Sequence, residues 1–378
     1  MALVYRSDIL PQSETFIREQ IIACRHWRGV LIGQRRLDEL ELDGLEVALL
    51  DGWKSPVCNW LGLGPDIQTL RRMRPRLLHA HFGPEAVAAA PLARALGIPM
   101  LVSLHGYDIN IHRDWWEKGQ GGARMRRYPT ALLKLAQRRD VHFVAVSEAL
   151  RARAIVYGIA PEKVTTCYIG VDVTKFAPGL IPLAERPPRI IFVGRLVEKK
   201  GCDILLRAMA MLHRDFPAAE LDIVGDGPLR AELKQLARQL DVPARFLGAL
   251  PSVQVKAALD QARIFCLPSV RAANGDAEGF GLALLEAQAV GLPVVSSAFG
   301  GAREGILHGE TGYHFEEGDV GTLSDQLGSL LADPEKAAVM GHNARAFAVS
   351  RFNIHNCTAA LEWLYDQMTE LNTDRLRI

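Results

Sequence analysis

Residues 189–213 read RIIFVGRLVEKKGCDILLRAMAMLH, and this stretch shows the pattern on which the chain is built. The apolar run Ile190–Val193 is short enough for a strand buried on both faces, and it ends at Gly194. After a charged loop, Asp203–His213 places apolar residues at helical spacing. A buried strand followed by a helix is half of a βαβ unit, which requires a parallel sheet.

The same alternation of strand and helix runs along the chain twice. Further strands are expected at Leu77–His79, Met100–Leu104, Phe143–Val146, Leu221–Val224, Ile264–Leu267 and Val294–Ser296, and further helices at Glu85–Leu96 and Pro228–Leu240. The pattern predicts an α/β protein with two Rossmann-like, doubly wound domains, residues 1–175 and 188–352, facing a central cleft. The proline-rich segment 176–189 is expected to be a linker, and a last helix at about 353–371 to pack back on the first domain.

Composition and charge exclude several classes of protein. The 378 residues are 49% hydrophobic and 23% charged, which is typical of a folded globular protein. A net charge of +1 argues against a dedicated nucleic-acid-binding protein. No two cysteines have CxxC spacing, so a zinc ribbon is not expected, and thiols this sparse fit a reducing cytosol. The six are Cys24, Cys58, Cys167, Cys202, Cys266 and Cys357.

The charge distribution bears on membrane contact. No stretch reaches the roughly 18 uninterrupted apolar residues of a membrane span, and the N-terminus does not resemble a signal peptide. Residues 1–180 carry a net charge of +6 and the remainder −5, with the basic excess in 71–76 and 124–139. We expect a cytoplasmic protein that lies peripherally on the anionic cytoplasmic face of the membrane, with Trp115 and Trp116 as interfacial anchors. The alternative is that these basic segments are solvated helix faces.

The loop after the strand Ile190–Val193 carries the first candidate site. Gly194, Arg195 and Lys200 lie between this strand and the next helix. Two cations at the carboxyl end of a strand can hold a diphosphate, each contact contributing about 4 kcal/mol before desolvation. The alternative is that both residues are exposed and only cap a turn.

The second motif is GDAEGFGLALLE at residues 275–286, where the run from Leu282 is helical. Gly279 and Gly281 allow backbone N–H groups at the helix start to approach an anion. Glu278 on the loop and Glu286 in the helix are strong acceptors for sugar hydroxyls. Two acids beside a phosphate site favour a nucleotide-sugar, which carries a diphosphate and two sets of hydroxyls. The alternative is a surface loop acid and an ordinary helix former.

Other turns that follow expected strands carry further candidate residues. Gly225-Asp226-Gly227 permits close approach of a ligand, although the GxGxxG fingerprint is absent and a plain turn is an equal alternative. Residues 296–304 form another glycine-containing turn after an expected strand. In the first domain, His105 ends a strand and precedes a glycine, which favours a ligand contact, whereas for His81 a structural role is favoured. Ser13 is a predicted N-cap whose helix end could face the diphosphate.

Taken together, these motifs resemble retaining glycosyltransferases of family 4, which have the GT-B fold, and the first loop Leu10–Phe16 resembles the branch that builds exopolysaccharide and colanic-acid-type repeat units. The resemblance implies that Arg195 and Lys200 bind the donor diphosphate and that Glu286 holds the ribose. It also implies that Glu278, with the backbone of Phe280, Gly281 and Leu282, contacts the donor sugar and phosphate, with His105 near the transferred sugar.

The expected activity is transfer of a hexose from a UDP- or GDP-linked sugar with retention at the anomeric carbon. No nucleophile is evident beside the sugar, so same-face attack is expected, and no DxD-type metal site or cofactor motif is evident. The expected acceptor is a saccharide carried on a polyprenyl diphosphate. Two alternatives remain open: a nucleotide-sugar 2-epimerase of the same fold, or an inactive relative that serves as an assembly subunit.

Overall fold

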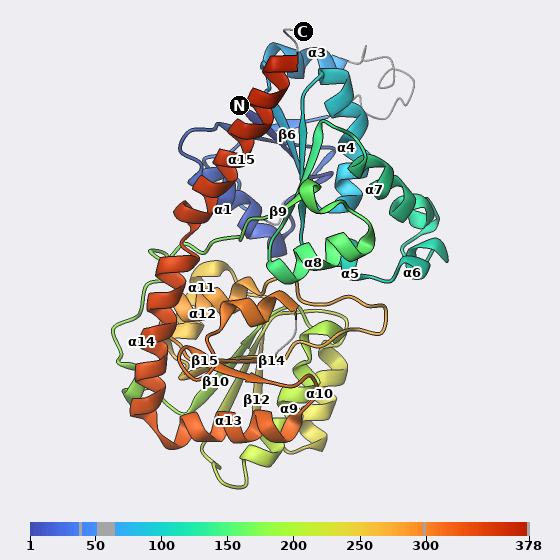
Figure 1. Ribbon diagram of the computed structural model, residues 1–378. Coiled ribbons are helices and arrows are strands. Elements are labelled where there is room, and N and C mark those ends of the chain that lie inside the picture. The colour runs from blue at the N-terminus through green and yellow to red at the C-terminus, as the bar shows by residue number, and fades with distance from the viewer. Residues whose placement is uncertain (38–39, 51–64, 298–299, 376–378) are drawn as a thin grey trace. The chain divides into compact units, whose positions relative to one another are not determined.

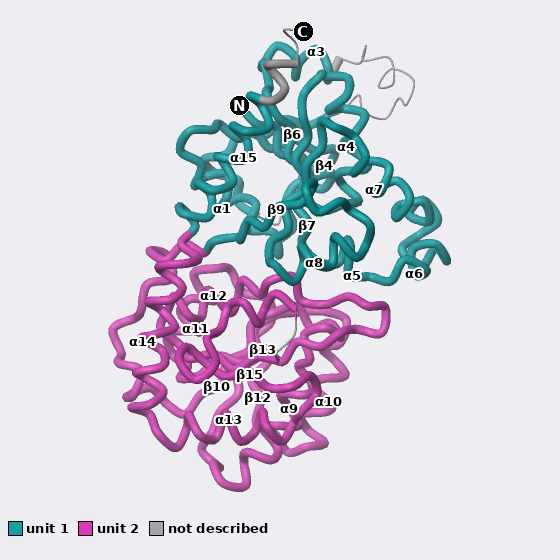
Figure 2. Tube along the Cα trace, viewed as in Figure 1, with its two compact units in different colours: residues 1–170, 354–378 teal, residues 171–353 magenta. Residues whose placement is uncertain are grey.

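The computed structural model describes residues 1–37, 40–50, 65–297 and 300–375. The chain divides into two compact units, shown in Figure 2: unit 1 comprises residues 1–170 and 354–378, and unit 2 comprises residues 171–353. Each unit has its own parallel sheet and is described by itself.

Unit 1 is built on a parallel sheet whose described strands lie in the order β5-β3-β1-β6-β7-β8-β9 (Figure 1). They are β1 (Ala2–Tyr5), β3 (Gly29–Gly33), β5 (Glu46–Leu49), β6 (Leu77–His81), β7 (Met100–Leu104), β8 (Val141–Ala145) and β9 (Val164–Thr166). The chain order reverses between the neighbours β1 and β6. At such a switch point the two following loops part to opposite faces of the sheet, which leaves room for a ligand.

Helices and short elements connect these strands. The helices are α1 (Thr15–Ala23), α3 (Pro65–Arg72), α4 (Gly83–Leu96), α5 (Tyr107–Asn110), α6 (Arg113–Glu117), α7 (Tyr128–Ala136) and α8 (Glu148–Tyr157). A separate parallel pair is formed by β2 (Asp8–Ile9) and β4 (Arg35–Arg36). Every residue of β1, β6 and β7 is buried, as expected for central strands of a parallel sheet, and the buried residues include His79 and His81 of β6 and Ser103 of β7.

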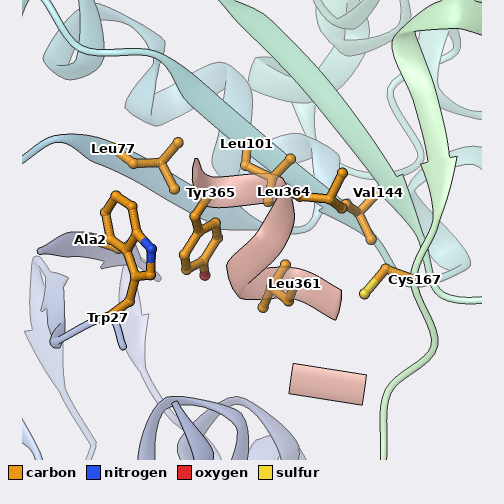
Figure 3. Close-up of a cluster of buried hydrophobic side chains, with 9 residues drawn as sticks. All are labelled: Ala2, Trp27, Leu77, Leu101, Val144, Cys167, Leu361, Leu364 and Tyr365. Carbon is orange, nitrogen blue, oxygen red and sulfur yellow. The ribbon is translucent and has the colours of Figure 1, made fainter. Parts of the chain in front are cut away.

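The final helix, α15 (Ile354–Arg375), belongs to unit 1. Figure 3 shows its residues Leu361, Leu364 and Tyr365 packed in one cluster with side chains of the sheet and with Trp27. Polar contacts add to this packing. The Glu362 carboxylate accepts hydrogen bonds from the N–H groups of Arg25, His26 and Trp27 at 2.7–3.0 Å, which ties the turn before β3 to α15.

Unit 2 has a second parallel sheet, in the order β12-β11-β10-β13-β14-β15. Its strands are β10 (Arg189–Val193), β11 (Glu220–Val224), β12 (Ala244–Gly248), β13 (Ile264–Leu267), β14 (Val294–Ser297) and β15 (Gly312–Phe315). Its helices are α9 (Cys202–Leu212), α10 (Arg230–Gln239), α11 (Ser252–Asp260), α12 (Leu282–Ala289), α13 (Val320–Ala332) and α14 (Pro334–Arg351). The switch point lies between β10 and β13, the two strands that precede the main predicted motifs. Both units are therefore Rossmann-like, as predicted.

The segment 176–189 is not a linker. The units divide at residues 170 and 171, so the whole proline-rich segment belongs to unit 2. The Gly179 N–H donates to Asp260 at 3.0 Å, and the buried Arg186 guanidinium donates to the carbonyl groups of Leu259 and Ala262. Proline fits an irregular segment bound to a helix as well as it fits a linker, so composition alone did not separate the two.

One of the two predicted membrane anchors, Trp116, is buried. Trp116 is 4% exposed, and its ring packs edge-on against Trp115 and Tyr128, with centroids 5.0 Å apart in both pairs. The prediction that Trp116 is an interfacial anchor is therefore wrong, because its ring is part of the protein interior. Among the described residues, no helix is long and apolar enough to cross a bilayer.

The described cysteines are not candidates for the chemistry of the sites. Within the described residues they are free thiols, and all but Cys24 are buried. Burial raises the pKa of Cys167 and of Cys202 to about 12, so both are inert at neutral pH. Cys58 lies outside the described residues, as do residues 298 and 299 of the turn 296–304.

Candidate functional site

The candidate site of unit 2 begins with the loop that follows β10. It contains Gly194, the exposed Arg195 and a 3₁₀ turn at Glu198–Lys200, and it ends at Gly201. Gly201 has φ +60°, and a Cβ atom there would lie 1.9 Å from the Pro268 carbonyl oxygen. Glycine is required here because the loops after β10 and β13 touch through their backbones.

Lys200 and Glu278 form the central contact of this site. The Lys200 ammonium donates a hydrogen bond to the Glu278 carboxylate, and both side chains are about seven-eighths buried. A Cβ atom on Gly194 would lie 3.5 Å from Cδ and Cε of Lys200, and one on Gly281 would lie 3.7 Å from Cγ of Glu278. The structure therefore brings together four of the predicted residues at the switch point of the sheet.

The Glu278 carboxylate is held in its charged form. Burial opposes its charge, but the ammonium groups of Lys200 and Lys199 and the Gly279 N–H together lower its pKa below the usual value. An ionised carboxylate only accepts hydrogen bonds, so it can bind sugar hydroxyls but cannot serve as an acid at neutral pH.

Three further contacts tie the two loops together, and the motifs did not predict them. The Lys199 ammonium pairs with Asp276 at 2.9 Å, and its carbonyl oxygen accepts from Val270 N–H at 2.9 Å. Glu198 accepts from the Ala273 N–H at 2.9 Å. The loop that carries Glu278 is thus fixed along its length to the turn that carries Lys200.

The start of α12 lies beside this ion pair. Gly281 is the N-cap, with φ +87°, and Leu282 is the first helical residue. The Phe280 side chain is buried, with its ring 5.2 Å from that of Phe352, so this side chain does not face a ligand. Glu286 lies half-buried in the second turn of α12.

At the turn 225–227, contacts with the protein's own backbone explain why residues 225 and 227 are glycine. A Cβ atom on Gly225 would lie 1.9 Å from the Gly194 carbonyl oxygen, and one on Gly227 would lie 2.5 Å from that of Leu196. Asp226 is exposed, accepts from the Gly227 N–H at 2.7 Å and lies 3.4 Å from the Arg230 guanidinium. Contact between neighbouring loops thus accounts for both glycines, and a ligand contact at this turn stays a prediction.

In unit 1, His105 lies just after β7 and is partly exposed. Its Nε2 is 3.0 Å from Nδ1 of His81, the last residue of β6. The buried Asp108 carboxylate accepts from the N–H groups of His105 and Gly106 at 3.1 and 2.8 Å, which fixes the backbone at this turn. His79, two residues before His81, lies between the Tyr365 and Ser103 hydroxyls at 2.7 and 2.8 Å.

All three histidines are neutral at pH 7. Burial lowers the pKa of His79 and of His105 to about 3, and it lowers the pKa of His81 well below its usual value. The hydrogen bond between His81 and His105 therefore joins two neutral rings, in which one nitrogen donates and the other accepts.

The switch point of unit 1 holds a charged network that the sequence did not reveal. The Arg6 guanidinium donates two hydrogen bonds to Glu14, both at 2.7 Å, and one to Glu85 at 2.5 Å. The Ser7 N–H and hydroxyl also donate to Glu85, both at 2.8 Å. Burial opposes the charge of Arg6, but the two carboxylates raise its pKa above the usual value. The only sign of this network in the sequence was an arginine at the end of the first strand.

Ser13 is not an N-cap. It lies exposed inside the 3₁₀ turn Gln12–Glu14, and α1 begins at Thr15 with Glu14 at the N-cap position and no side-chain cap. The 3₁₀ turn lies directly before the helix, so Ser13 precedes the N-cap position and does not occupy it.

Comparisons with known proteins place this fold in a family. Residues 178–347 match the family model "Glycosyl transferases group 1", and residues 31–175 match "Glycosyltransferase Family 4". The GDP-mannose-dependent alpha-(1-6)-phosphatidylinositol monomannoside mannosyltransferase of Mycolicibacterium smegmatis is 34% identical over 312 residues, which cover 76% of this chain and 77% of that relative. The chain belongs to glycosyltransferase family 4.

Other relatives of this family 4 glycosyltransferase come from polysaccharide pathways. The putative colanic acid biosynthesis glycosyltransferase WcaL of Escherichia coli is 34% identical over 72% of this chain and 66% of the relative. The amylovoran biosynthesis glycosyltransferase AmsK of Erwinia amylovora is 36% identical over 56% of this chain and 52% of the relative. The matched residues thus span from half to two thirds of the length of these two relatives.

Solved structures show the same fold. Anabaena Alr3699/HepE in complex with UDP superposes on this family 4 glycosyltransferase with a TM-score of 0.80 at 20% identity, covering 97% of this chain and 100% of the other. The same protein in complex with UDP-glucose gives 0.78, also at 20% identity, covering 99% of both chains. The likeness establishes the GT-B fold.

Proposed function

We propose that this family 4 glycosyltransferase transfers a hexosyl group from a nucleoside diphosphate sugar to a hydroxyl of a saccharide acceptor during assembly of a cell-envelope or exported polysaccharide. The observation that carries the proposal is the Lys200–Glu278 ion pair at the switch point of unit 2, between Gly194 and the N-cap Gly281. The printed names of the colanic acid and amylovoran relatives, and the UDP-glucose complex of HepE, support the substrate class.

Each side chain of this site has a part in the proposal. Lys200 and Arg195 neutralise the donor diphosphate, and the N–H groups at the start of α12 bind the same group. Glu278, held ionised, accepts from hydroxyls of the transferred sugar, and Glu286 accepts from those of the ribose. His105 of unit 1 contacts the transferred sugar. These roles follow the family resemblance, and the geometry of unit 2 supports them for Lys200 and Glu278.

We further propose that the anomeric configuration is retained. The bond between C1 of the sugar and the diphosphate oxygen breaks, and the acceptor oxygen bonds to C1 on the same face. The acceptor's proton passes to an oxygen of the departing diphosphate, so the step requires no protein base. Lys200 and Arg195 stabilise the charge that develops on the leaving group, which lowers the barrier.

Turnover and stereochemistry test this function together. The protein is incubated with UDP- or GDP-linked glucose, galactose or mannose and a lipid-linked saccharide, and the new anomeric proton is followed by NMR. A new glycosidic bond with the donor's configuration is expected, and incubation with donor alone should give no epimerised sugar. An inverted product would contradict retention, whereas epimerisation without acceptor would contradict transfer.

A lipid-linked acceptor would bring the chain to the membrane, and unit 1 offers a basic surface for this contact. Arg124, Arg126 and Arg127 are exposed around the 3₁₀ turn Ala123–Arg127, and Lys134 is exposed on α7. We propose that this surface lies on anionic lipid, where each cation contributes about 1 kcal/mol. Flotation with anionic vesicles should fall in a triple Arg→Gln variant at these arginines, and unchanged flotation would contradict this surface.

A further inference from the structure

His105 has only one ring nitrogen left for a ligand. Its Nε2 is bonded to Nδ1 of His81 at 3.0 Å, and neither ring is charged at neutral pH. We propose that His81 is a positioning residue: it occupies Nε2 of His105 and so presents Nδ1 of His105 to the transferred sugar. This inference rests on the proposed function, because it assigns one atom of that donor site.

The sheet fixes the distance between the two rings. β6 and β7 are neighbouring parallel strands in which His81 is paired with Ser103, so the residue after β7 is carried past the end of β6. His81 is 1% exposed, whereas His105 is partly exposed. One ring is therefore a fixed part of the interior, and the other reaches the surface while bonded to it.

Packing prevents the His105 ring from turning over. The Phe82 and Phe16 rings lie 4.5 and 5.0 Å from it, centroid to centroid, and the Asp108 carboxylate holds its backbone. A ring flip would remove Nε2 from His81 and leave a buried nitrogen of His81 without its partner, which is unfavourable. The hydrogen bond therefore selects one orientation of His105.

The His81 ring is itself held in place by its neighbours. The His79 ring lies 4.3 Å from it, centroid to centroid, and is fixed by Tyr365 and Ser103. A cavity of about 10 Å³, lined by Gln20 and Tyr365 among others, adjoins both histidines. Removal of the His81 ring would enlarge this cavity, so an alanine variant would lose packing as well as the hydrogen bond. Asparagine is the sharper variant, because its amide can occupy the position of Nδ1.

A matched pair of variants at His105 tests which nitrogen matters. The asparagine amide lies near the position of Nδ1 and the glutamine amide near that of Nε2. If Nδ1 contacts the sugar, His105→Asn retains roughly 10-fold more kcat than His105→Gln, the size expected for one hydrogen bond that forms fully in the transition state. Equal loss in both, or better activity of His105→Gln, would overturn the assignment of Nδ1.

Variants at His81 test the positioning role. His81→Ala should lower kcat roughly 10-fold with KM for the donor changed less than about 3-fold, and His81→Asn should recover most of the loss. His142→Asn is the control, because His142 bonds Thr165 at 2.8 Å in the same sheet without touching His105. If His81→Asn is as poor as His81→Ala, or if both are fully active, His81 does not position His105.

Nitrogen NMR of histidine-labelled protein gives a readout that does not depend on turnover. The Nε2 signal of His105 should shift in His81→Asn or His81→Phe, and the Nδ1 signal should shift when the donor sugar nucleotide is added to the wild type. A donor-induced shift confined to Nε2 would overturn the proposal. Failure of the wild type to bind any donor would contradict the proposed function instead, while the coupling of His81 to Nε2 would still be observed.

Discussion

The Lys200 ammonium is bonded to the Glu278 carboxylate, although the two residues are 78 positions apart in the chain. They meet because β10 and β13 are adjacent in the sheet and both following loops cross the same edge. A diphosphate bound by Lys200 must therefore share this cation with Glu278. The acid that is proposed to hold the sugar is also a competitor of the phosphate.

This competition predicts opposite effects on binding and turnover in Glu278→Gln. Loss of the carboxylate should tighten the binding of free UDP or GDP roughly 5-fold, because it removes a competing contact to Lys200 worth about 1 kcal/mol. Transfer should fall by at least about 10-fold, since a contact to the sugar is weakened. Isothermal titration and initial rates measure the two effects. Asp260→Asn is the control, because Asp260 pairs with Lys256 elsewhere in unit 2.

The close backbone contact at Gly201 predicts that any side chain at this position is destabilising for steric reasons. A substitution at a second glycine, with a similar φ but open space around it, separates this steric effect from backbone strain. Gly201→Ala places a Cβ atom 1.9 Å from the Pro268 carbonyl oxygen, so the loops that carry Lys200 and Glu278 must separate. We expect thermal unfolding to show a loss of at least about 2 kcal/mol and donor binding to weaken. Gly309→Ala has a similar φ of +81° with open space around it, and should lose only about 1 kcal/mol with normal binding. Equal behaviour of the two variants would contradict the steric account.

The buried histidines predict how stability depends on pH. Burial lowers the pKa of His79 to about 3, whereas an unfolded histidine titrates near pH 6.5. The unfolded state therefore binds more protons between these values, so the stability from neutral His79 is complete above about pH 6.5 and is lost as pH falls toward 3. Removal of this group should reduce the slope of unfolding free energy against pH by up to about 1.4 kcal/mol per unit. Denaturant unfolding of His79→Asn at pH 7, 6 and 5 measures it, and an unchanged slope would contradict the assignment.

The contacts of Lys199 predict that it affects donor binding without touching the donor. Asp276→Asn removes the charge partner of Lys199 and frees the loop that carries Glu278. We expect donor affinity to fall several-fold while the unfolding free energy falls by only about 1 kcal/mol, since both side chains are partly exposed. Titration calorimetry with calorimetric unfolding compares the two. A loss of stability without a loss of affinity would show that the contact is only structural.

The predictions from sequence succeeded where one segment carried the whole signal. The strands Met100–Leu104 and Ile264–Leu267 were predicted with the observed bounds, because each is a predominantly apolar run, interrupted only by Ser103 in the first, that is flanked by polar residues or proline. The strand Ala244–Gly248 was not predicted, because it lies at the edge of its sheet and alternates between exposed and half-buried residues. A short edge strand whose only adjacent large apolar side chains are Phe246 and Leu247 has no longer apolar run to reveal it.

In the candidate site too, only features carried by one short segment were predicted. Lys200 and Glu278 were predicted because each lies in a short motif with glycine, after a recognisable strand. The contacts between Lys199 and Asp276, and between Arg6 and Glu85, join residues 77 and 79 positions apart, and only the order of the strands brings them together. Spacing along the chain carries no signal for such pairs. The hydrogen bond between His81 and His105 was missed for the same reason.

Binding of UDP and GDP to the wild type and to Lys200→Met, measured by titration calorimetry, tests whether Lys200 holds the donor diphosphate. We predict that the wild type binds at least one of the two and that Lys200→Met binds it at least about 10-fold more weakly, while Lys256→Met, which removes the Lys256–Asp260 pair elsewhere in unit 2, binds normally. Binding that is equally tight in the wild type and in Lys200→Met would show that the diphosphate does not lie at the switch point between β10 and β13.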